Sequence, residues 1–423
     1  MKSKRLITYG LLLLCSKLPA QNKPIITLEQ CYQLTGANSP LAQQKALTVT
    51  AGNLSQENQN LKWLPVVNLG AQASYQSDVT SFPIKLPGIN VEELSKDQYK
   101  GTIEIVQPIY DAGIISSQKK LQSNSTNIET QKLEIDLYQL KSKVNTYFFT
   151  VLLMDENIRL MKIMMNDLDN NIKKVSAQAQ YGIATNSNVD VLNAERIKAV
   201  QKVIEFEATK KAAVKMLEIL TATTIDVNTI FIKPLGLEIK ADTVSMRPEL
   251  KLFDFQKQQF IQQGKLINAR AKPTFSFFTT GGYGRPGLNM LRNEFQWYYF
   301  GGLKLTIPIM NQFTKQKEKN VFKIQEQIVE KQKENFLNNS KLMLVQQKSE
   351  VEKYMALVAT DTSIVHLRTR IKDNAAFKLA NGIITSSDYI TELNAENQAM
   401  LNQNLHEIQL LQAQYNYQLI LGK

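Results

Sequence analysis

The sequence predicts a mainly α-helical protein with a β-barrel part, in which long coiled-coil helices adjoin two β-hairpins. Three observations predict it: a long heptad pattern, two pairs of alternating segments, and an internal duplication. The chain has 423 residues, 43% of them hydrophobic and 21% charged, which is typical of a folded protein. Two or three globular domains would be usual at this length, but the long helical patterns favour one elongated body.

The heptad pattern runs from Leu133 to Ala179, where apolar residues recur at steps of four and three. A repeat of 3.5 residues keeps one stripe facing a partner helix, so the pattern indicates a left-handed coiled coil. Asp111 can cap the start of the helix, which we predict over 112–181. At 1.5 Å per residue such a helix is roughly 105 Å long.

The first 20 residues are typical of a secretory signal peptide. Three basic residues precede an apolar stretch that is too short to span a bilayer, and Ala20 offers a small residue for cleavage. Cys15 raises the possibility of a lipid anchor, which the bulky Leu14 disfavours. Removal of residues 1–20 leaves Cys31 as the single cysteine, so packing, and no internal disulfide, must stabilise the exported chain.

The basic charge of the chain is dispersed. The signal holds four of the 50 Lys and Arg residues and none of the 38 acids, so its removal lowers the formal charge from +12 to +8. The charges alternate along helical faces, which favours solvated coiled-coil surfaces and argues against nucleic-acid binding. No run of 18 apolar residues follows the signal, so the mature chain is either soluble after export or meets a membrane through strands.

The first repeat covers 21–222 and begins with Thr27 to Gln30, a capping box that opens a helix. Ser39 is placed to cap a second helix. Period-two alternation then predicts a β-hairpin over 65–108, followed by the long helix and a return helix over 186–222.

The second repeat covers 247–423 and follows an equatorial segment, 223–246, at mid-tunnel. Its predicted elements follow the same order, with the hairpin containing a Gly-rich loop from Gly281 to Gly287. They are a helix over 247–271, a hairpin over 273–308, a long helix over 312–381 and a return helix over 385–421.

The two repeats match residue by residue. Pro108 and Ile109 recur as Pro308 and Ile309, and Leu192-Asn193-Ala194-Glu195 recurs as Leu393-Asn394-Ala395-Glu396. Similarity in this order indicates a duplicated architecture. Asp361, Arg368 and Lys372 interrupt the seam of the second long helix, and two readings stay open: irregular packing, or a polar seam that loosens this helix.

Hairpin strands of roughly ten residues have the length of a transmembrane β-strand. Open sheet edges are forbidden in lipid and four strands cannot close a barrel, so copies must pool their strands. Three copies give twelve strands, the smallest set that leaves a lumen. Trp297 and its aromatic neighbours resemble an interfacial girdle. The alternative is a soluble sheet that packs on helices.

The chain resembles the TolC-like outer-membrane efflux proteins. The resemblance rests on Thr27-Leu28-Glu29, the Asn38 to Pro40 motif, the run from Gln107 to Gly113, and the paired tips Tyr181-Gly182 and Asn381-Gly382. It implies a homotrimer with a twelve-stranded barrel in the outer membrane and a helical tunnel in the periplasm. It also implies two partners, a periplasmic adaptor (membrane fusion) protein and an inner-membrane transporter.

The sequence offers no catalytic constellation and no metal site. His366 and His406 are the only histidines and both lie in helical patterns. Gly282, Gly284 and Gly287 match a dinucleotide fingerprint formally, but they lack the strand–turn–helix context, so a surface loop is the preferred interpretation. We expect no enzyme activity and no cofactor.

The candidate functional residues lie at the two tips, where each long helix turns back. The glycines there can serve only as helix caps, or the tips can also dock an adaptor hairpin. The candidate docking residues are Gly182, Ile183, Thr185, Ser187, Gly382, Ile383, Thr385 and Ser387.

Asp388 follows the second tip, and the resemblance implies that acids at this position line a closed pore entrance. Three copies would form an anionic ring, to which Glu392 could add a second. Thr391 stands where the family carries its partner acid, and ordinary solvated carboxylates are the alternative.

The predicted function is a passive exit duct, opened by untwisting of the paired helices; an exported coiled-coil scaffold without a pore is the alternative. The cargo, the transporter and the gate residues do not follow from the sequence.

Overall fold

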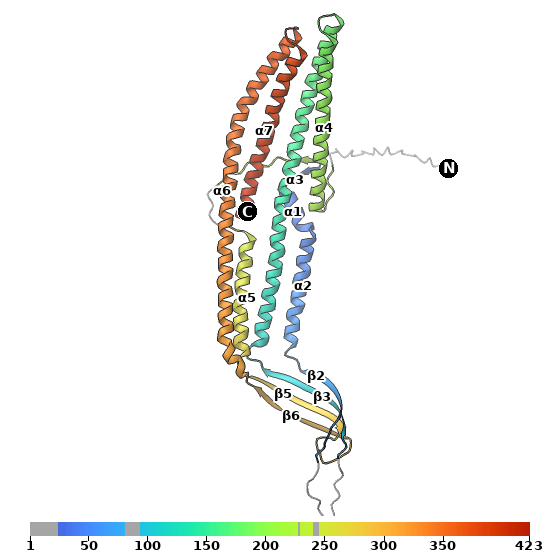
Figure 1. Cartoon of the computed structure of the whole chain (residues 1–423), viewed down its shortest axis with the longest axis vertical. Helices are drawn as coiled ribbons and strands as arrows, with labels where there is room; N and C mark the ends of the chain where they lie inside the picture. Colours follow the sequence, from blue (N-terminus) through green and yellow to red (C-terminus); the bar gives the residue numbers. More distant parts are fainter. Residues whose placement is uncertain (1–23, 81–93, 227–228, 240–244) are drawn as a thin grey trace, which may run out of the picture. The chain divides into compact units, whose positions relative to one another are not determined.

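The computed structural model describes residues 24–80, 94–226, 229–239 and 245–423 (Figure 1). The expected signal peptide over 1–20, with Cys15, lies outside these residues. The described part is mainly helical, as predicted, with four long strands and two very short ones. The helices are α1 (Leu28–Asn38), α2 (Pro40–Leu61), α3 (Ile114–Gln180), α4 (Asn186–Thr221), α5 (Pro248–Arg270), α6 (Ile309–Ala380) and α7 (Ser386–Leu421).

None of these helices, within the part of the chain that the structure describes, is both long and apolar enough to cross a membrane.

Three predicted helix starts are confirmed by their hydrogen bonds. The capping box is formed because Gln30 N donates to Thr27 Oγ1 and Thr27 N donates to Gln30 Oε1. Ser39 Oγ accepts from Leu41 N at the start of α2. The Asp111 carboxylate accepts from the backbone N–H groups of Gly113 and Ile115 at the start of α3. Each cap satisfies amide donors that a helix end leaves free.

The four long strands form one antiparallel sheet in the order β2-β3-β5-β6, so the two predicted hairpins lie side by side. The strands are β2 (Val66–Tyr75), β3 (Asp97–Tyr110), β5 (Thr274–Arg285) and β6 (Gln296–Thr306). In the register, Leu69 pairs with Ile103 and Tyr283 with Trp297. The edges of the sheet within one chain are β2 and β6.

One face of this sheet is apolar and uncovered. Leu69, Trp297 and Tyr299 are 80%, 82% and 83% exposed. The opposite face carries polar residues such as Gln72, Lys100 and Thr102, together with the aromatic pair Phe278–Phe300. Alternation along each strand therefore separates an apolar face from a mostly polar one.

The predicted Gly-rich loop is wrong in its first half, because β5 continues to Arg285. A Cβ on Gly282 would lie 2.5 Å from the Tyr298 ring, and a Cβ on Gly284 would lie 2.6 Å from the Tyr99 carbonyl oxygen. The glycines thus make room for neighbours on adjacent strands, a role that turn statistics do not reveal.

Two strands of two residues each escape period-two analysis. β1 (Ile25–Ile26) pairs in parallel with β4 (Ile230–Phe231). Phe231 packs edge-on against Phe148 of α3, with ring centroids 5.4 Å apart. This contact ties part of the expected equatorial segment to the long helix.

The chain divides into two compact units, and each takes segments from both predicted repeats. Unit 1 comprises residues 1–35, 143–237 and 354–412, and unit 2 comprises residues 36–142, 238–353 and 413–423. α3 and α6 are continuous through both. The boundaries of the two repeats stay predictions.

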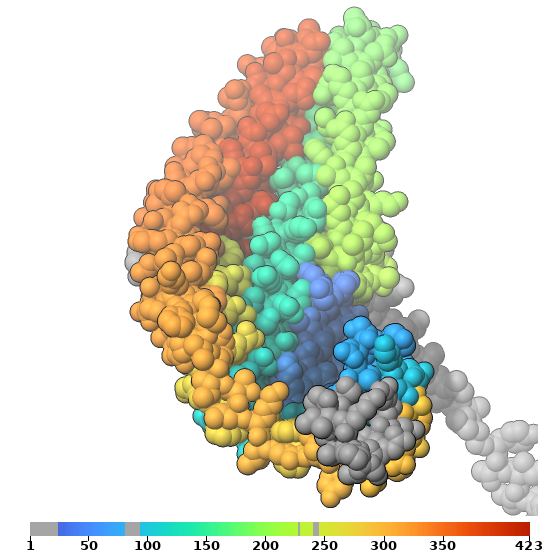
Figure 2. Space-filling model, turned by 60° about the horizontal axis from the view of Figure 1, so that its bottom comes forward, coloured from blue at the N-terminus to red at the C-terminus, as the bar shows by residue number. Residues whose placement is uncertain are grey.

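Within unit 1, α3 packs on α4 and α6 packs on α7. The predicted seam is confirmed there, since Val151, Leu168 and Val175 of α3 are at most 1% exposed. Within unit 2, Lys45 of α2 pairs with Glu134 of α3, and Lys257 of α5 with Glu330 of α6. Figure 2 shows α5 in yellow along α6 in orange, and α2 in blue beside α3 in teal.

Candidate docking tips and entrance

Each long helix of unit 1 ends in the same glycine cap. Gly182 and Gly382 have φ of 75° and 68°, in the left-handed region that glycine adopts without strain. Ile183 N donates to Gln178 O and Gly182 N to Ala179 O, and the same two bonds recur at the second tip. This is the Schellman arrangement, which requires the left-handed backbone conformation that both glycines adopt.

The two tips lie against each other. A Cβ on Gly382 would lie 3.9 Å from Ile183 Cγ2. Gln178 Nε2 donates to Ala380 O at 2.7 Å, and Ser386 N donates to Asn188 Oδ1 at 3.4 Å. The structure therefore brings the two sets of predicted tip residues together into one surface.

That surface is exposed and partly apolar. Ile183 and Ile383 are 69% and 67% exposed, and Tyr181 and Phe377 beside them are exposed as well. Thr185, Ser187, Thr385 and Ser387 are also exposed. No other residue in the described part of the chain covers these large apolar side chains, so the tips present an apolar surface to solvent.

The second tip differs from the first in its cap. Thr385 N and Thr385 Oγ1 donate to Asp388 Oδ2, and Asp388 N donates back to Thr385 Oγ1, which closes a capping box. These hydrogen bonds, the one from the Thr385 hydroxyl first, lower the pKa of Asp388. Thr185 at the first tip makes no side-chain cap hydrogen bond. Asn188 occupies the position that matches Asp388, and its side-chain oxygen accepts from Ser386 N.

Glu392, the second entrance candidate, has a different partner. Its carboxylate lies 3.5 Å from Arg368 Nη1, which links α7 to α6. Asp388 and Glu392 are both partly or fully accessible on α7, but the structure gives them separate partners and does not join them into one cluster.

The three polar residues that interrupt the α6 seam are all paired. Asp361 Oδ2 lies 2.7 Å from His406 Nδ1 of α7 and accepts a hydrogen bond when that ring nitrogen carries the proton. Arg368 faces Glu392, and Lys372 Nζ lies 3.4 Å from Glu396 and 3.5 Å from Asp167 of α3. Burial opposes the charge on Lys372, but the surrounding carboxylates raise its pKa.

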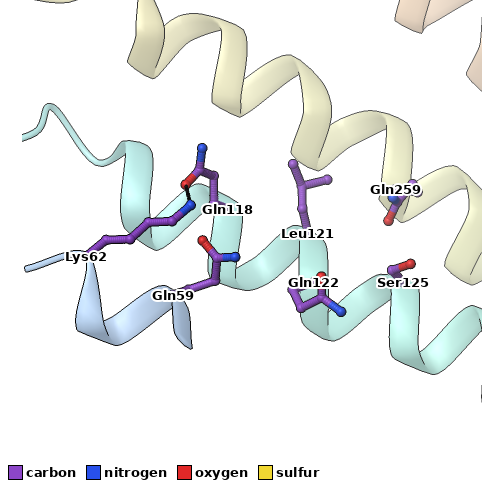
Figure 3. A pocket seen from close by; sticks show the side chains of 7 residues that line it. All are labelled: Gln59, Lys62, Gln118, Leu121, Gln122, Ser125 and Gln259. Atoms are coloured by element: carbon purple, nitrogen blue, oxygen red, sulfur yellow. Dashed lines mark hydrogen bonds between the residues drawn. The ribbon is translucent and has the colours of Figure 1, made fainter. Parts of the chain in front are cut away.

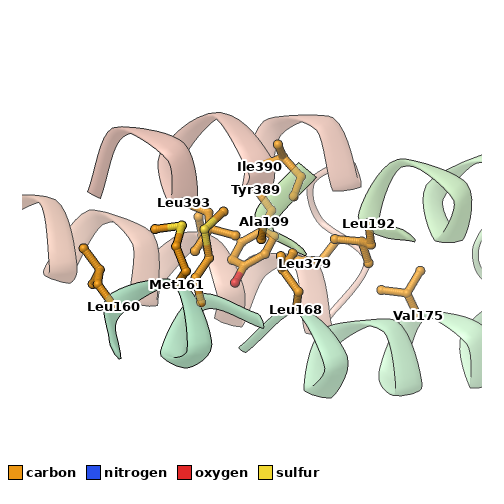
Figure 4. Close-up of a cluster of buried hydrophobic side chains, with 12 residues drawn as sticks. Leu160, Met161, Leu168, Val175, Leu192, Ala199, Leu379, Tyr389, Ile390 and Leu393 are labelled. Carbon is orange, nitrogen blue, oxygen red and sulfur yellow. The ribbon is translucent and has the colours of Figure 1, made fainter. Parts of the chain in front are cut away.

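A buried cluster directly behind the tips holds four helices together (Figure 4). Tyr389 of α7 is 1% exposed and points into it, between Leu168 of α3 and Leu379 of α6. Its hydroxyl accepts from Asn171 Nδ2 at 2.9 Å. The tips are thus carried on a packed base, and their exposed residues add little to its stability.

The described residues contain no group of three or more histidine, cysteine and acidic side chains that could hold a metal ion. The lone thiol of Cys31 is buried, and burial raises its pKa to about 12.

No protein-family model matches the sequence, and no curated protein matches it. Solved structures do match. A membrane protein from Pseudomonas aeruginosa superposes with a TM-score of 0.71 at 12% identity, over 93% of this chain and 90% of that one. The Campylobacter jejuni CmeC outer membrane channel gives a TM-score of 0.68 at 14% identity, over 93% and 85%. The Vibrio cholerae outer membrane protein VceC gives 0.66 at 11% identity, over 93% and 94%.

The chain has the TolC-type channel fold.

The TolC-type fold confirms the predicted fold class, with long helices and two hairpins in each chain. The match extends over nearly the whole of these comparison structures, so it includes both the helices and the strands of this chain.

Sequence reasoning missed several tip residues. Asn188 and Ser386 join the tips, and Phe377 enlarges the exposed surface. The duplication could have indicated that Asn188 belongs to the tips, because Asn188 and Asp388 occupy equivalent positions in the two repeats and differ in charge. Nothing in the sequence pairs Lys372 with Asp167, since that contact joins segments about 200 residues apart.

Proposed function

We propose that this protein is a homotrimeric outer-membrane channel that serves as the passive exit duct of a tripartite efflux or secretion system. Its sheets would form the barrel in the outer membrane, and its helices would form a tunnel in the periplasm. The duct does no chemistry. Energy and substrate selection would come from an inner-membrane transporter, reached through a periplasmic adaptor.

The observation that carries this proposal is the four-stranded sheet with an uncovered apolar face and two unpaired edges. In water such a face would be a liability, whereas lipid covers it at no cost. In lipid the edges β2 and β6 must find partners, and identical copies supply them. The TolC-type fold supports this reading, and the comparison channels are described as outer-membrane proteins.

The tips are the proposed adaptor-docking surface. Ile183 and Ile383 offer apolar anchors, with the hydroxyl groups of Thr185, Ser187 and Ser387 around them. A central apolar contact with a polar rim is the usual composition of a protein interface. Asp388 and Glu392 are proposed to line the periplasmic entrance, where three copies of each would attract cations.

Electrophoresis and electrical recording test the proposal together. The protein, purified in mild detergent, should run without heating as a trimer and with heating as a single chain, whose mass is 48.0 kDa before removal of the expected signal peptide. The trimer should insert into planar bilayers and conduct in discrete steps. A monomer that stays soluble without detergent and never conducts would favour the alternative function, an exported coiled-coil scaffold.

A further inference from the structure

The end of unit 2 where helices meet the sheet is strongly basic. Four stretches meet there, 58–65, 111–122, 264–273 and 307–320, because each joins a helix to a strand. They hold nine basic residues and only two acids, Asp111 and Glu318. The basic residues are Lys62, Lys119, Lys120, Lys265, Arg270, Lys272, Lys315, Lys317 and Lys319. We call this set the basic belt.

None of the nine belt residues forms a salt bridge with a described residue, although lysines elsewhere on the same helices do. Lys333 of α6 pairs with Asp254, and Lys257 of α5 pairs with Glu330. One of the two acids, Asp111, already uses its carboxylate to accept hydrogen bonds from backbone N–H groups at the start of α3. The belt therefore carries a concentrated positive charge that the described part of the chain leaves uncompensated.

Exposed apolar and aromatic side chains adjoin the belt on the sheet side. Trp63, Tyr110 and Phe313 are 42%, 50% and 72% exposed. Trp and Tyr favour the boundary between hydrocarbon and headgroups, and lysine stems extend from there toward water. The order along the molecule is an apolar sheet face, then exposed aromatic rings, then cations.

A polar pocket opens within the belt, with a volume of about 340 Å³ (Figure 3). Its lining comes from α2, α3 and α5 and contains no acid: Gln59, Lys62, Gln118, Leu121, Gln122, Ser125 and Gln259. Lys62 Nζ donates to Gln118 Oε1 at 2.9 Å. The side-chain amide oxygen of Gln59 is buried and has no hydrogen-bond partner among the described residues.

We infer that the basic belt binds the headgroups of anionic phospholipids in the periplasmic leaflet, and that the pocket beside Lys62 seats one of them. The phosphate would meet the ammonium group of Lys62, the one cation among the residues that line the pocket, while Lys119 and Lys120 of the belt would face other headgroups. A glycerol headgroup also carries hydroxyl groups, from which the unpartnered side-chain oxygen of Gln59 can accept a hydrogen bond. The inference rests on the proposed function, since it requires the sheet to lie in a bilayer.

The test uses Trp63 as a reporter. The chain has two tryptophans, so the Trp297→Phe variant leaves Trp63 as the single fluorophore. The full-length protein is reconstituted into phosphatidylcholine vesicles containing brominated phosphatidylglycerol, and quenching is compared with that by brominated phosphatidylcholine. We expect the lipid beside Trp63 to be phosphatidylglycerol at least five times as often as phosphatidylcholine at low salt, because a single basic group near an anionic surface already contributes about a factor of five.

Two matched triple variants in the same background separate the belt from general charge. Lys62→Gln, Lys119→Gln and Lys120→Gln together should reduce the preference to near one. Lys173→Gln, Lys174→Gln and Lys341→Gln remove three exposed cations that lie outside the belt, and should leave it unchanged. Native mass spectrometry of the protein without the Trp297 substitution, counting retained phosphatidylglycerol, gives the same comparison independently.

Vesicle flotation distinguishes failure of the inference from failure of the proposed function. If the protein floats as a trimer but Trp63 is quenched equally by both lipids, the inference about the basic belt is wrong and the proposed channel function is unaffected. An equal loss of preference in both triple variants also overturns it. Protein that never floats with vesicles overturns both.

Discussion

The ammonium nitrogen of Lys372 lies 3.4 Å from a carboxylate oxygen of Glu396, in a seam where the two side chains are only 12% and 7% exposed. Asp167 of α3 reaches the same nitrogen at 3.5 Å. One cation therefore joins three helices of unit 1, at a seam position that a coiled coil normally gives to an apolar residue.

Removing that cation should be costly. Lys372→Met leaves Glu396 buried without a partner, and we expect a loss of about 3 kcal/mol in unfolding free energy. Lys378→Met, on the same helix, should change the unfolding free energy little, because Lys378 is exposed and forms no ion pair with a described residue. Denaturant unfolding followed by circular dichroism measures both. A Lys372→Met protein as stable as the control would mean that this charge cluster contributes nothing net.

Two tyrosines, Tyr389, which is buried, and Tyr138, which is partly buried, should titrate late. Burial raises the pKa of Tyr138 and of Tyr389 to about 12, from an ordinary value of 10. The unfolded chain ionises first, so their contribution to stability is complete below pH 10 and declines as the pH rises from 10 to 12. Absorbance at 295 nm should show two fewer late-titrating groups in the Tyr138→Phe, Tyr389→Phe variant. Identical titrations of the two proteins would contradict this.

The entrance charge can be separated from the helix cap. We expect Asp388→Asn to raise single-channel conductance and weaken block by divalent cations, because three negative charges leave the entrance while an acceptor for the Thr385 donors remains. Asp136→Asn, which removes an exposed carboxylate from α3 within unit 2, is the matched control. If Asp388→Asn leaves conductance and block as they were, Asp388 does not line the entrance.

Docking should depend on the tip isoleucines. Ile183→Ser with Ile383→Ser removes two exposed apolar anchors, so adaptor affinity should fall at least tenfold while the melting temperature stays within about a degree. Surface plasmon resonance with a purified periplasmic adaptor protein measures the affinity. Ile204→Ser with Ile219→Ser, exposed on α4 away from the tips, is the matched control. Equal losses in both pairs would place docking elsewhere.

The tip glycines should show a backbone cost alone. Gly382→Ala forces a side-chain-bearing residue to φ near 68° with only ordinary contact to Ile183, so we expect about 1 kcal/mol of destabilisation. Gly382→Asn should cost less, because asparagine tolerates this conformation. Thermal melts of the two variants provide the comparison. Equal and large losses would indicate that the tip is packed more tightly than in the described structure.

Local rules predicted much of this fold. The heptad residues of α3 are buried, the alternating segments form strands, and three caps are made by the expected side chains. Two-residue strands such as β1 and β4 are too short to show a period of two. Gly282 lies within a strand, and it is glycine because the ring of Tyr298 on the neighbouring strand leaves no room for a Cβ. Long-range pairs such as Lys372 with Asp167 require the fold first. The roles of the tip residues in docking stay predictions, since exposure alone does not name a partner.

The two free edges of the sheet have a consequence for mixtures of subunits. If copies join β6 of one to β2 of the next, the joint is head-to-tail, and every member needs both of its edges. A subunit damaged only at β6 still offers β2, so it would enter a ring and prevent closure. When half of the expressed copies carry such a lesion, only about one ring in eight would be whole. An edge mutation in this protein would therefore be dominant-negative, because the altered subunit would also inactivate the unaltered subunits in its ring.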